Sequence, residues 1–373
     1  MDWTAWIEHY GEPRVLLVGG LLSGLLFGFF AQRSKFCLRA AVIEFWHRKF
    51  GDKLAVWLLA FATAVVGVQL MVLLGGLDLS SARQLAARGS LSGALIGGLI
   101  FGVGMVMTRG CASRLLVLSA NGNLRALLSG LVFAVTAQAA LGGILAPWRE
   151  ALSALWTVDG GDSRNLLALT GVGPWGGLAF GLVWLAAALF FAVRSGWGFW
   201  KWFGGLGTGL MVALAWAGTY QVMSHSFEVV QIQGLTFSGP SAEWLMHVLH
   251  DASGPWTFGL GLMPGVFLGS LAGALLGREW KLEGFGGGYT MPRYIIGAIL
   301  MGFGSMLAGG CAVGAGMTGG AIFAVTAWVT LVGMWIGGGV ADRLLDGAHK
   351  HAPAPAPSAH TAPVAASAPT AAP

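Results

Sequence analysis

The chain has 373 residues and a formal net charge of +5, and 55% of its residues are hydrophobic while only 10% are charged. Ordinary soluble domains contain about 25% charged residues. This composition excludes a soluble enzyme, a disordered regulator and a nucleic-acid binder. The basic residues are spread along the chain instead of forming one strip, so the positive charge indicates membrane topology rather than an anionic macromolecular partner.

Nine apolar runs follow one another along the chain. About 20 apolar residues are needed to cross the hydrocarbon layer of a bilayer as a helix. The runs cover approximately residues 15–31, 54–77, 90–108, 124–146, 175–193, 203–223, 256–276, 294–307 and 319–341. Arg125, near the start of the fourth run, is the only charged residue within them. The sequence therefore predicts an all-α integral membrane protein with about nine spans in the lipid bilayer.

The connecting segments predict the orientation. Sixteen of the 21 Lys and Arg residues fall in alternate segments, beginning with six between the first two runs. Cytoplasmic loops carry the excess of Lys and Arg. This pattern predicts a periplasmic N-terminus and a cytoplasmic C-terminus. Residues 1–347 form the expected transmembrane domain, and the Ala- and Pro-rich residues 348–373 are expected to be a disordered tail.

A short repeat relates the two halves of the chain. The segment Gly-Val-Gly-Met-Val-Met-Thr-Arg-Gly-Cys111 matches Gly-Phe-Gly-Ser-Met-Leu-Ala-Gly-Gly-Cys311 at a spacing of 200 residues. With nine spans, the two copies approach from opposite sides of the membrane. The expected halves, about 15–146 and 203–341, are then inverted repeats joined by a span at about 175–193. Many transporters place their substrate between such repeats.

The region from 294 to 341 contains 48 residues without Asp, Glu, Lys or Arg. It is long enough for two helices and a Gly-rich link around Cys311. A link at the water surface would be polar, whereas irregular backbone inside the membrane lines a cavity or is buried in protein. We therefore predict re-entrant loops that carry cysteines, with a tight surface hairpin as the alternative.

The three cysteines, Cys37, Cys111 and Cys311, each follow a predicted span. A free cysteine commonly behaves as a small buried apolar residue. Three at comparable positions favour instead a path for a ligand with soft sulfur of its own, which neutral thiols would contact. Basic side chains and Gly-rich backbone beside them would attract an anion. These supporting residues are Arg33, Lys35, Arg109, Gly110, Arg114, Gly309 and Gly310.

Other cysteine chemistry is less favoured. No Cys-x-x-Cys pair is present, so neither metal nor cofactor is expected. His247 and His250, with Glu243 and Asp251, have the spacing of a weak metal motif but fit an amphipathic outer helix better. A disulfide between Cys111 and Cys311 conflicts with their approach from opposite sides.

The three cysteine segments, including Gln32-Arg-Ser-Lys-Phe-Cys37, resemble the YeeE/YedE sulfur-transport family over about residues 15–341. The resemblance implies a bacterial inner-membrane protein for thiosulfate uptake, not an enzyme. It implies that Cys37, Cys111 and Cys311 lie on re-entrant loops and pass thiosulfate along by S–H···S contacts. It also implies a separate TusA-like sulfur carrier protein as a partner of some members. Three alternatives stay open: another sulfur or selenium compound, a persulfide relay, and a membrane subunit of a larger complex.

Overall fold

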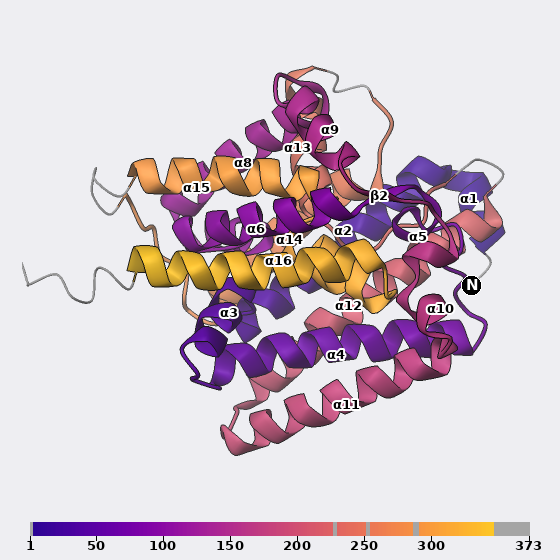
Figure 1. Cartoon of the computed structure of the whole chain (residues 1–373), viewed down its shortest axis with the longest axis horizontal. Coiled ribbons are helices and arrows are strands. Elements are labelled where there is room, and N and C mark those ends of the chain that lie inside the picture. The colour runs from indigo at the N-terminus through magenta and orange to yellow at the C-terminus, as the bar shows by residue number, and fades with distance from the viewer. Residues whose placement is uncertain (1–2, 227–229, 251–253, 286–290, 347–373) are drawn as a thin grey trace, which may run out of the picture.

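The computed structural model describes residues 3–226, 230–250, 254–285 and 291–346, so the predicted tail at 348–373 lies outside the described residues. Helices dominate this part of the chain (Figure 1). The first half contains α1 (Trp3–Tyr10), α2 (Glu12–Ser34), α3 (Leu38–Trp46), α4 (Asp52–Leu73), α5 (Arg83–Ala86), β1 (Gly89–Ser90), α6 (Leu91–Met107), α7 (Ala112–Ala120), α8 (Leu124–Gly142) and α9 (Ala146–Ala154). The rest contains β2 (Thr157–Val158), η1 (Asp162–Arg164), α10 (Leu166–Thr170), α11 (Gly173–Arg194), α12 (Phe199–His225), α13 (Ser238–Leu249), α14 (Phe258–Leu276), α15 (Met291–Leu307), η3 (Ala312–Gly319), α16 (Val325–Ala341) and η4 (Asp342–Asp346).

Eight segments of the described residues are helical, long and apolar enough to cross a membrane. Together with the absence of any sheet larger than the two-residue pair β1–β2 in this part of the chain, they confirm the predicted all-α membrane protein. The predicted span at 203–223 corresponds to α12, the sixth of the long helices in chain order, and it is not among those eight segments. Its 27 residues are long enough to cross, but its Gly, Thr and Trp residues lower its mean hydropathy.

One predicted boundary is wrong. The run at 319–341 was expected to be helical throughout, but α16 begins only at Val325. The residues before it belong to η3, a short π-helix, and to the turn that follows it. The Gly-rich stretch is too flexible to continue a regular helix, so the apolar run divides into a short helix and a long one.

The long helices pair in an order that repeats between the two halves. From the first half, α2 packs on α14 and α6 packs on α16, helices of the second half; the equivalent pairs are α12 on α4 and α15 on α8. The equivalent helices also meet directly, α2 with α12 and α6 with α15. This arrangement has the two-fold pattern of an internal repeat, with α11 outside it against α4.

Close contacts between glycines and backbone show how α6 and α15 run past each other. Along α6 and α15, Gly93 lies against Leu307, Gly97 against Gly304 and Gly104 against the glycine at 297. As the residue number rises in one helix it falls in the other, so α6 and α15 are antiparallel. Small residues permit this approach of two backbones inside a membrane. The two helices that precede Cys111 and Cys311 therefore run in opposite directions across the bundle.

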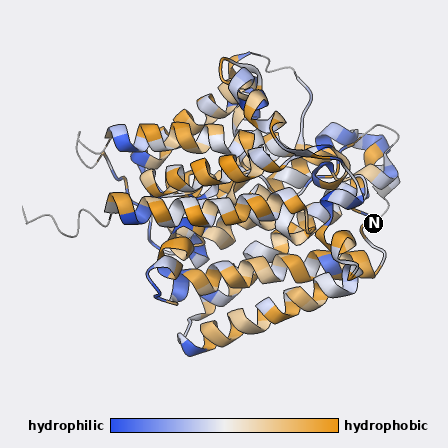
Figure 2. Ribbon diagram, viewed as in Figure 1, coloured by the Kyte–Doolittle hydropathy of each residue, from blue (hydrophilic) through white to orange (hydrophobic). Residues whose placement is uncertain are grey.

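The bundle has two ends with different charge. At one end α2, α6 and α14 end while α4, α8, α12 and α15 begin, and contacts such as Asp52 with Lys201 and Asn123 with Glu283 join them. We call this end the basic face because most of the described Lys and Arg residues lie there. The other end, which carries β1, β2 and η1, is the opposite face. Figure 2 shows hydrophilic residues near both ends and hydrophobic ones along the helices between them.

Candidate functional site

Each cysteine occupies the same structural position, the residue immediately before a short helix. Cys37 precedes α3, Cys111 precedes α7 and Cys311 precedes η3. In every case a long helix ends four or fewer residues earlier, so the chain breaks and turns beside the cysteine. The first N–H groups of a helix lack backbone partners and carry partial positive charge. The three sulfur atoms therefore lie where an anion is favoured.

The turns before the cysteines share one backbone feature. Lys35, Arg109 and Gly309 each stand two residues before a cysteine, and their φ angles are 56°, 59° and 78°. These left-handed conformations reverse the chain after the long helix. Gly310 is required next to Cys311, since a Cβ there would lie 2.8 Å from the backbone nitrogen of Ala315. The predicted loop residues thus shape the turns that present the thiols.

Cys37 and Cys111 come together near the basic face. Their thiols are close enough to interact with each other, and the Cys111 sulfur lies 3.4 Å from the Ser113 hydroxyl. The guanidinium of Arg114, one turn into α7, is near both sulfur atoms. We refer to Cys37 and Cys111 as the thiol pair. All three cysteines of the chain are free.

Cys311 reaches the interior from the opposite face. The helix before it, α15, ends beside Gly93 in the first turn of α6, and η3 then packs against α7, the helix that follows Cys111. The Cys311 sulfur accepts a hydrogen bond of 3.5 Å from the backbone N–H of Gly314. Thiols from two opposed loops are thereby brought toward the centre of the bundle.

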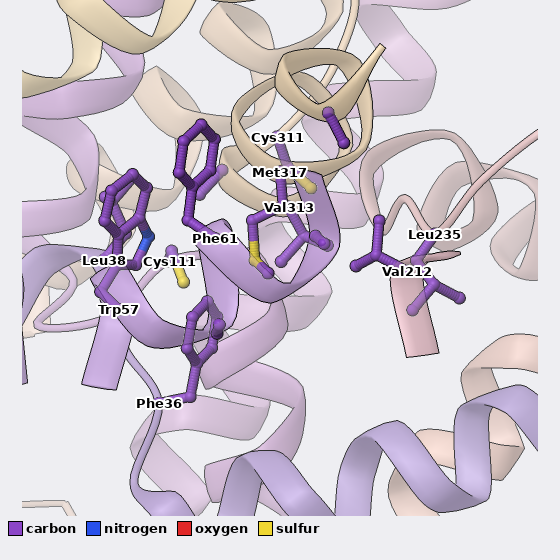
Figure 3. Packing of buried hydrophobic residues seen from close by; sticks show 14 of the residues in the cluster. Phe36, Leu38, Trp57, Phe61, Cys111, Val212, Leu235, Cys311, Val313 and Met317 are labelled. Carbon is purple, nitrogen blue, oxygen red and sulfur yellow. The ribbon is translucent and has the colours of Figure 1, made fainter. Parts of the chain in front are cut away.

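The surroundings of the thiols are apolar and closed. Figure 3 shows Cys111 and Cys311 within one cluster of buried side chains. Its members include Phe36, Leu38, Trp57, Phe61, Val313 and Met317. Cys111 is 0% exposed and Cys311 is 1% exposed, so this conformation keeps water from both thiols. A hydrated ion meets an apolar barrier here.

A polar cavity of about 190 Å³ adjoins the thiol pair on the basic face. We call it the vestibule. It is lined by Gln32, Lys35, Arg114, Leu118, Asn121, Asn123, Glu279, Lys281 and Glu283. Lys35 and Arg114 were predicted from the sequence, and the structure places both of them here.

Other predicted residues lie apart from the vestibule. The Arg33 guanidinium stacks over the Trp200 ring at 4.2 Å from its centroid. Arg109 is exposed on the basic face, while Gly309 and Gly310 accompany Cys311 on the other approach. The predicted residues thus form two groups, one on each side of the apolar cluster.

Sequence reasoning missed two polar residues, Gln32 and Glu279, that connect the vestibule to the thiol pair. Gln32 is only 2% exposed although it belongs to a motif quoted for its cysteine, and Glu279 is distant from every cysteine in the chain. An amide directly after a predicted span would have been a signal for Gln32. Phe237 was also missed. It precedes the short helix α13, the position equivalent to Cys37 in the second half, and packs on Phe27 with ring centroids 5.3 Å apart.

The histidines weighed as a metal motif have other contacts. His247 packs against the Trp256 ring at 5.1 Å between centroids, and the Glu243 carboxylate accepts a 2.7 Å hydrogen bond from Thr257. Asp251 lies outside the described residues. Across residues 3–226, 230–250, 254–285 and 291–346, no group of three or more His, Cys, Asp or Glu side chains could hold a metal ion.

Apolar helices long enough to cross a membrane, broken beside cysteines inside the bundle, define an all-α integral membrane protein of the kind that transporters use. The family is given by direct comparison, because residues 33–340 match the sulphur transport family. The chain therefore belongs to this family, as its cysteine segments predicted.

Two curated relatives cover nearly the same length. The thiosulfate transporter TsuA of Escherichia coli K12 is 25% identical over 348 residues, which are 86% of this chain and 92% of the relative. The thiosulfate transporter TsuA of Spirochaeta thermophila is 28% identical over 334 residues, which are 85% and 96% of the two chains. The similarity thus extends over whole proteins and not over one motif.

Proposed function

We propose that this protein carries thiosulfate into the cell across a bacterial inner membrane, along a path lined by the thiols of Cys37, Cys111 and Cys311. The observation that carries the proposal is the shared position of the three cysteines, each before a short helix at the break of a longer one. The family and the two curated relatives supply the substrate class, and the buried thiols supply contacts suited to it.

The chemistry of the substrate fits the proposed path. Thiosulfate is a dianion whose terminal sulfur is soft and polarizable. A neutral thiol donates an S–H···S hydrogen bond to such a sulfur and is itself polarizable. The helix N-termini beside the cysteines offset the negative charge. Sulfate presents only oxygen atoms, so it gains less from the thiols and loses more hydration in the apolar cluster.

The direction follows from the orientation proposed for the two faces. We place the basic face in the cytoplasm because cytoplasmic segments carry the excess of Lys and Arg. Thiosulfate then meets Cys311 first, passes the apolar cluster once it opens, and reaches the thiol pair and the vestibule. A separate TusA-like sulfur carrier is the proposed recipient on the basic face.

The decisive experiment uses purified protein in liposomes with labelled thiosulfate outside. We expect label to accumulate inside as intact thiosulfate, at a rate that excess unlabelled thiosulfate reduces and equal sulfate does not. Liposomes with the triple variant Cys37→Ala, Cys111→Ala, Cys311→Ala are the control. If the unchanged protein moves no label, the protein is not a self-contained transporter of thiosulfate.

A persulfide relay is the second candidate, because the contact between Cys37 and Cys111 would suit sulfur transfer between neighbouring thiols. In that reaction a thiolate attacks the outer sulfur of thiosulfate, the S–S bond breaks, and sulfite leaves while a persulfide forms on the cysteine. Intact-mass measurement after incubation with thiosulfate separates the two functions. Transport leaves the protein mass unchanged, and a relay adds one sulfur atom.

A further inference from the structure

The vestibule already contains an anion, the carboxylate of Glu279. One of its oxygens accepts a 2.9 Å hydrogen bond from the Gln32 amide, and the other lies 3.0 Å from the Lys35 ammonium. Gln32 lies in the last turn of α2 and Lys35 directly follows the end of that helix, so both shortly precede Cys37 in the chain. The carboxylate thus uses the donors that an anion leaving the thiols would meet first.

The connection continues to the thiols themselves. The Gln32 amide oxygen accepts from the Arg114 guanidinium at 3.5 Å, and Arg114 interacts with Cys37, Cys111 and Glu279 through its charge. Glu279, Gln32 and Arg114 therefore form one chain of polar contacts from the cavity to the sulfur atoms. A change of hydrogen-bond partner at Glu279 therefore alters the surroundings of Arg114, the charged group nearest the thiols.

The backbone holds Glu279 in place. After α14 ends, Arg278 adopts a φ of 53° and the Glu279 N–H donates 2.8 Å to the carbonyl of Ala274. This hydrogen bond is the C-terminal closure of the helix. Because α14 packs along α2, the backbone of Glu279 is fixed relative to Gln32 and Lys35, and only its side chain needs to rotate to move the carboxylate away.

We propose that Glu279 is a release residue. Its carboxylate gives up its contacts with Gln32 and Lys35 when thiosulfate arrives from the thiol pair and binds these two groups. When the carboxylate forms the same contacts again, it displaces thiosulfate from the vestibule. This inference rests on the proposed function. A vestibule with cations alone would retain a dianion, since Lys35, Arg114 and Lys281 all face it. The resident carboxylate competes for the same donors and keeps the affinity low enough for turnover.

The test is Glu279→Gln, which keeps the size and removes the charge. We expect thiosulfate to bind the purified variant about two- to fivefold more tightly, the factor that corresponds to one partly exposed ion pair. Uptake into liposomes should show a lower KM together with a lower maximal rate, because release becomes slow. Glu279→Asp, which keeps the charge, should restore most of the maximal rate.

Glu283→Gln is the matched control. Its carboxylate lines the same cavity but accepts from Asn123 at 2.7 Å and pairs with Lys281 at 2.8 Å. Removing this charge should change KM by a much smaller factor than Glu279→Gln. Equal effects of the two variants on KM would show that any negative charge in the vestibule acts alike, and this result would overturn the inference.

The remaining outcomes are also decisive. An unchanged or raised KM in Glu279→Gln, with the unchanged protein active, would overturn the release role and leave the proposed function intact. Inactive liposomes with the unchanged protein would instead contradict the proposed function. If Glu279→Gln does not insert, Lys35→Met tests the same pairing from its other side, and a KM that does not rise would contradict the inference.

Discussion

At the scale of single residues, the three cysteines are equivalent in backbone position but not in surroundings. Cys37 and Cys111 contact each other beside Arg114, whereas Cys311 is bonded by the N–H of Gly314. The proposed path thus holds two thiols with a cation on one side and one thiol with backbone donors on the other. Substitution at either side should have different consequences.

Cys111→Ala should lower thiosulfate uptake by about tenfold or more, since one sulfur hydrogen bond of roughly 1.5 kcal/mol is lost in the apolar cluster. Cys111→Ser keeps a donor of similar size without the polarizable sulfur, so we expect uptake between those of the alanine variant and the unchanged protein. The measurement is the initial rate of labelled uptake in cells that lack sulfate import. Full uptake by Cys111→Ala would contradict the role of its thiol.

The charges around the vestibule explain why its two carboxylates differ. The Lys281 ammonium and the Asn123 amide hold the pKa of Glu283 below its usual value, and Glu283 raises the pKa of Lys281 in return. This pair stays charged at neutral pH and loses its ion pair only in acid, as Glu283 takes up a proton. Glu279 also has an amide and an ammonium as partners, but its amide partner, Gln32, accepts a hydrogen bond from Arg114 beside the thiols.

At the scale of elements, glycine decides how the repeats meet. Adding a Cβ at Gly304 would place it 2.7 Å from the backbone nitrogen of Phe101, between α15 and α6. Other glycines, such as Gly309 and Gly310, shape the turn before Cys311 instead. The contact between α6 and α15 is the direct link between the two cysteine-bearing modules.

Gly304→Ala should destabilise the protein by about 1–3 kcal/mol, the usual cost of overpacking a close contact. Gly130→Ala is the control, because open space surrounds Gly130 in α8 and alanine favours the helix. Thermal unfolding in detergent should show a lower midpoint for Gly304→Ala and an equal or higher one for Gly130→Ala. Equal midpoints for both variants would show that the α6–α15 contact is not tight.

The element equivalent to the Cys37 turn is informative because it lacks a cysteine. Phe237 precedes α13 and is 1% exposed. The second half thus has an aromatic ring where the first half has a thiol. Equivalent positions in the two halves therefore carry side chains of different chemistry. Phe237→Ala should leave a cavity against Phe27, and the expected cost is about 3–5 kcal/mol.

At the scale of the whole molecule, the orientation decides which face is the exit. In a background with all three cysteines replaced by serine, Lys281→Cys and Asp159→Cys place single thiols on opposite ends of the bundle, at positions whose native side chains are 73% and 94% exposed. A membrane-impermeant maleimide added to intact spheroplasts should label the Asp159→Cys variant and not the Lys281→Cys variant. The reverse pattern would invert the proposed direction of transport.

Much of the architecture was accessible from the sequence. Apolar runs of about 20 residues have few solutions other than membrane helices, and the Gly-Cys match at 111 and 311 indicated the repeat. The start of the last long helix, predicted at residue 319, could not be placed from the sequence. Apolar Gly-rich residues occur both in membrane helices and in the irregular turns of buried loops, so their composition does not distinguish the two. The short helices α3 and α7 were also hidden inside polar or basic links.

The sequence by itself determined that this is a helical membrane protein of the sulphur transport family with three cysteines at helix breaks. These features depend on local composition and spacing. Only the tertiary structure decided that Cys37 meets Cys111, that Cys311 approaches from the other face, and that Glu279 reaches Gln32 across 247 positions. Such contacts depend on the packing of helices that are distant in sequence. Glycines such as Gly304 set how closely two helix backbones approach. No local sequence pattern encodes the distance between the two backbones.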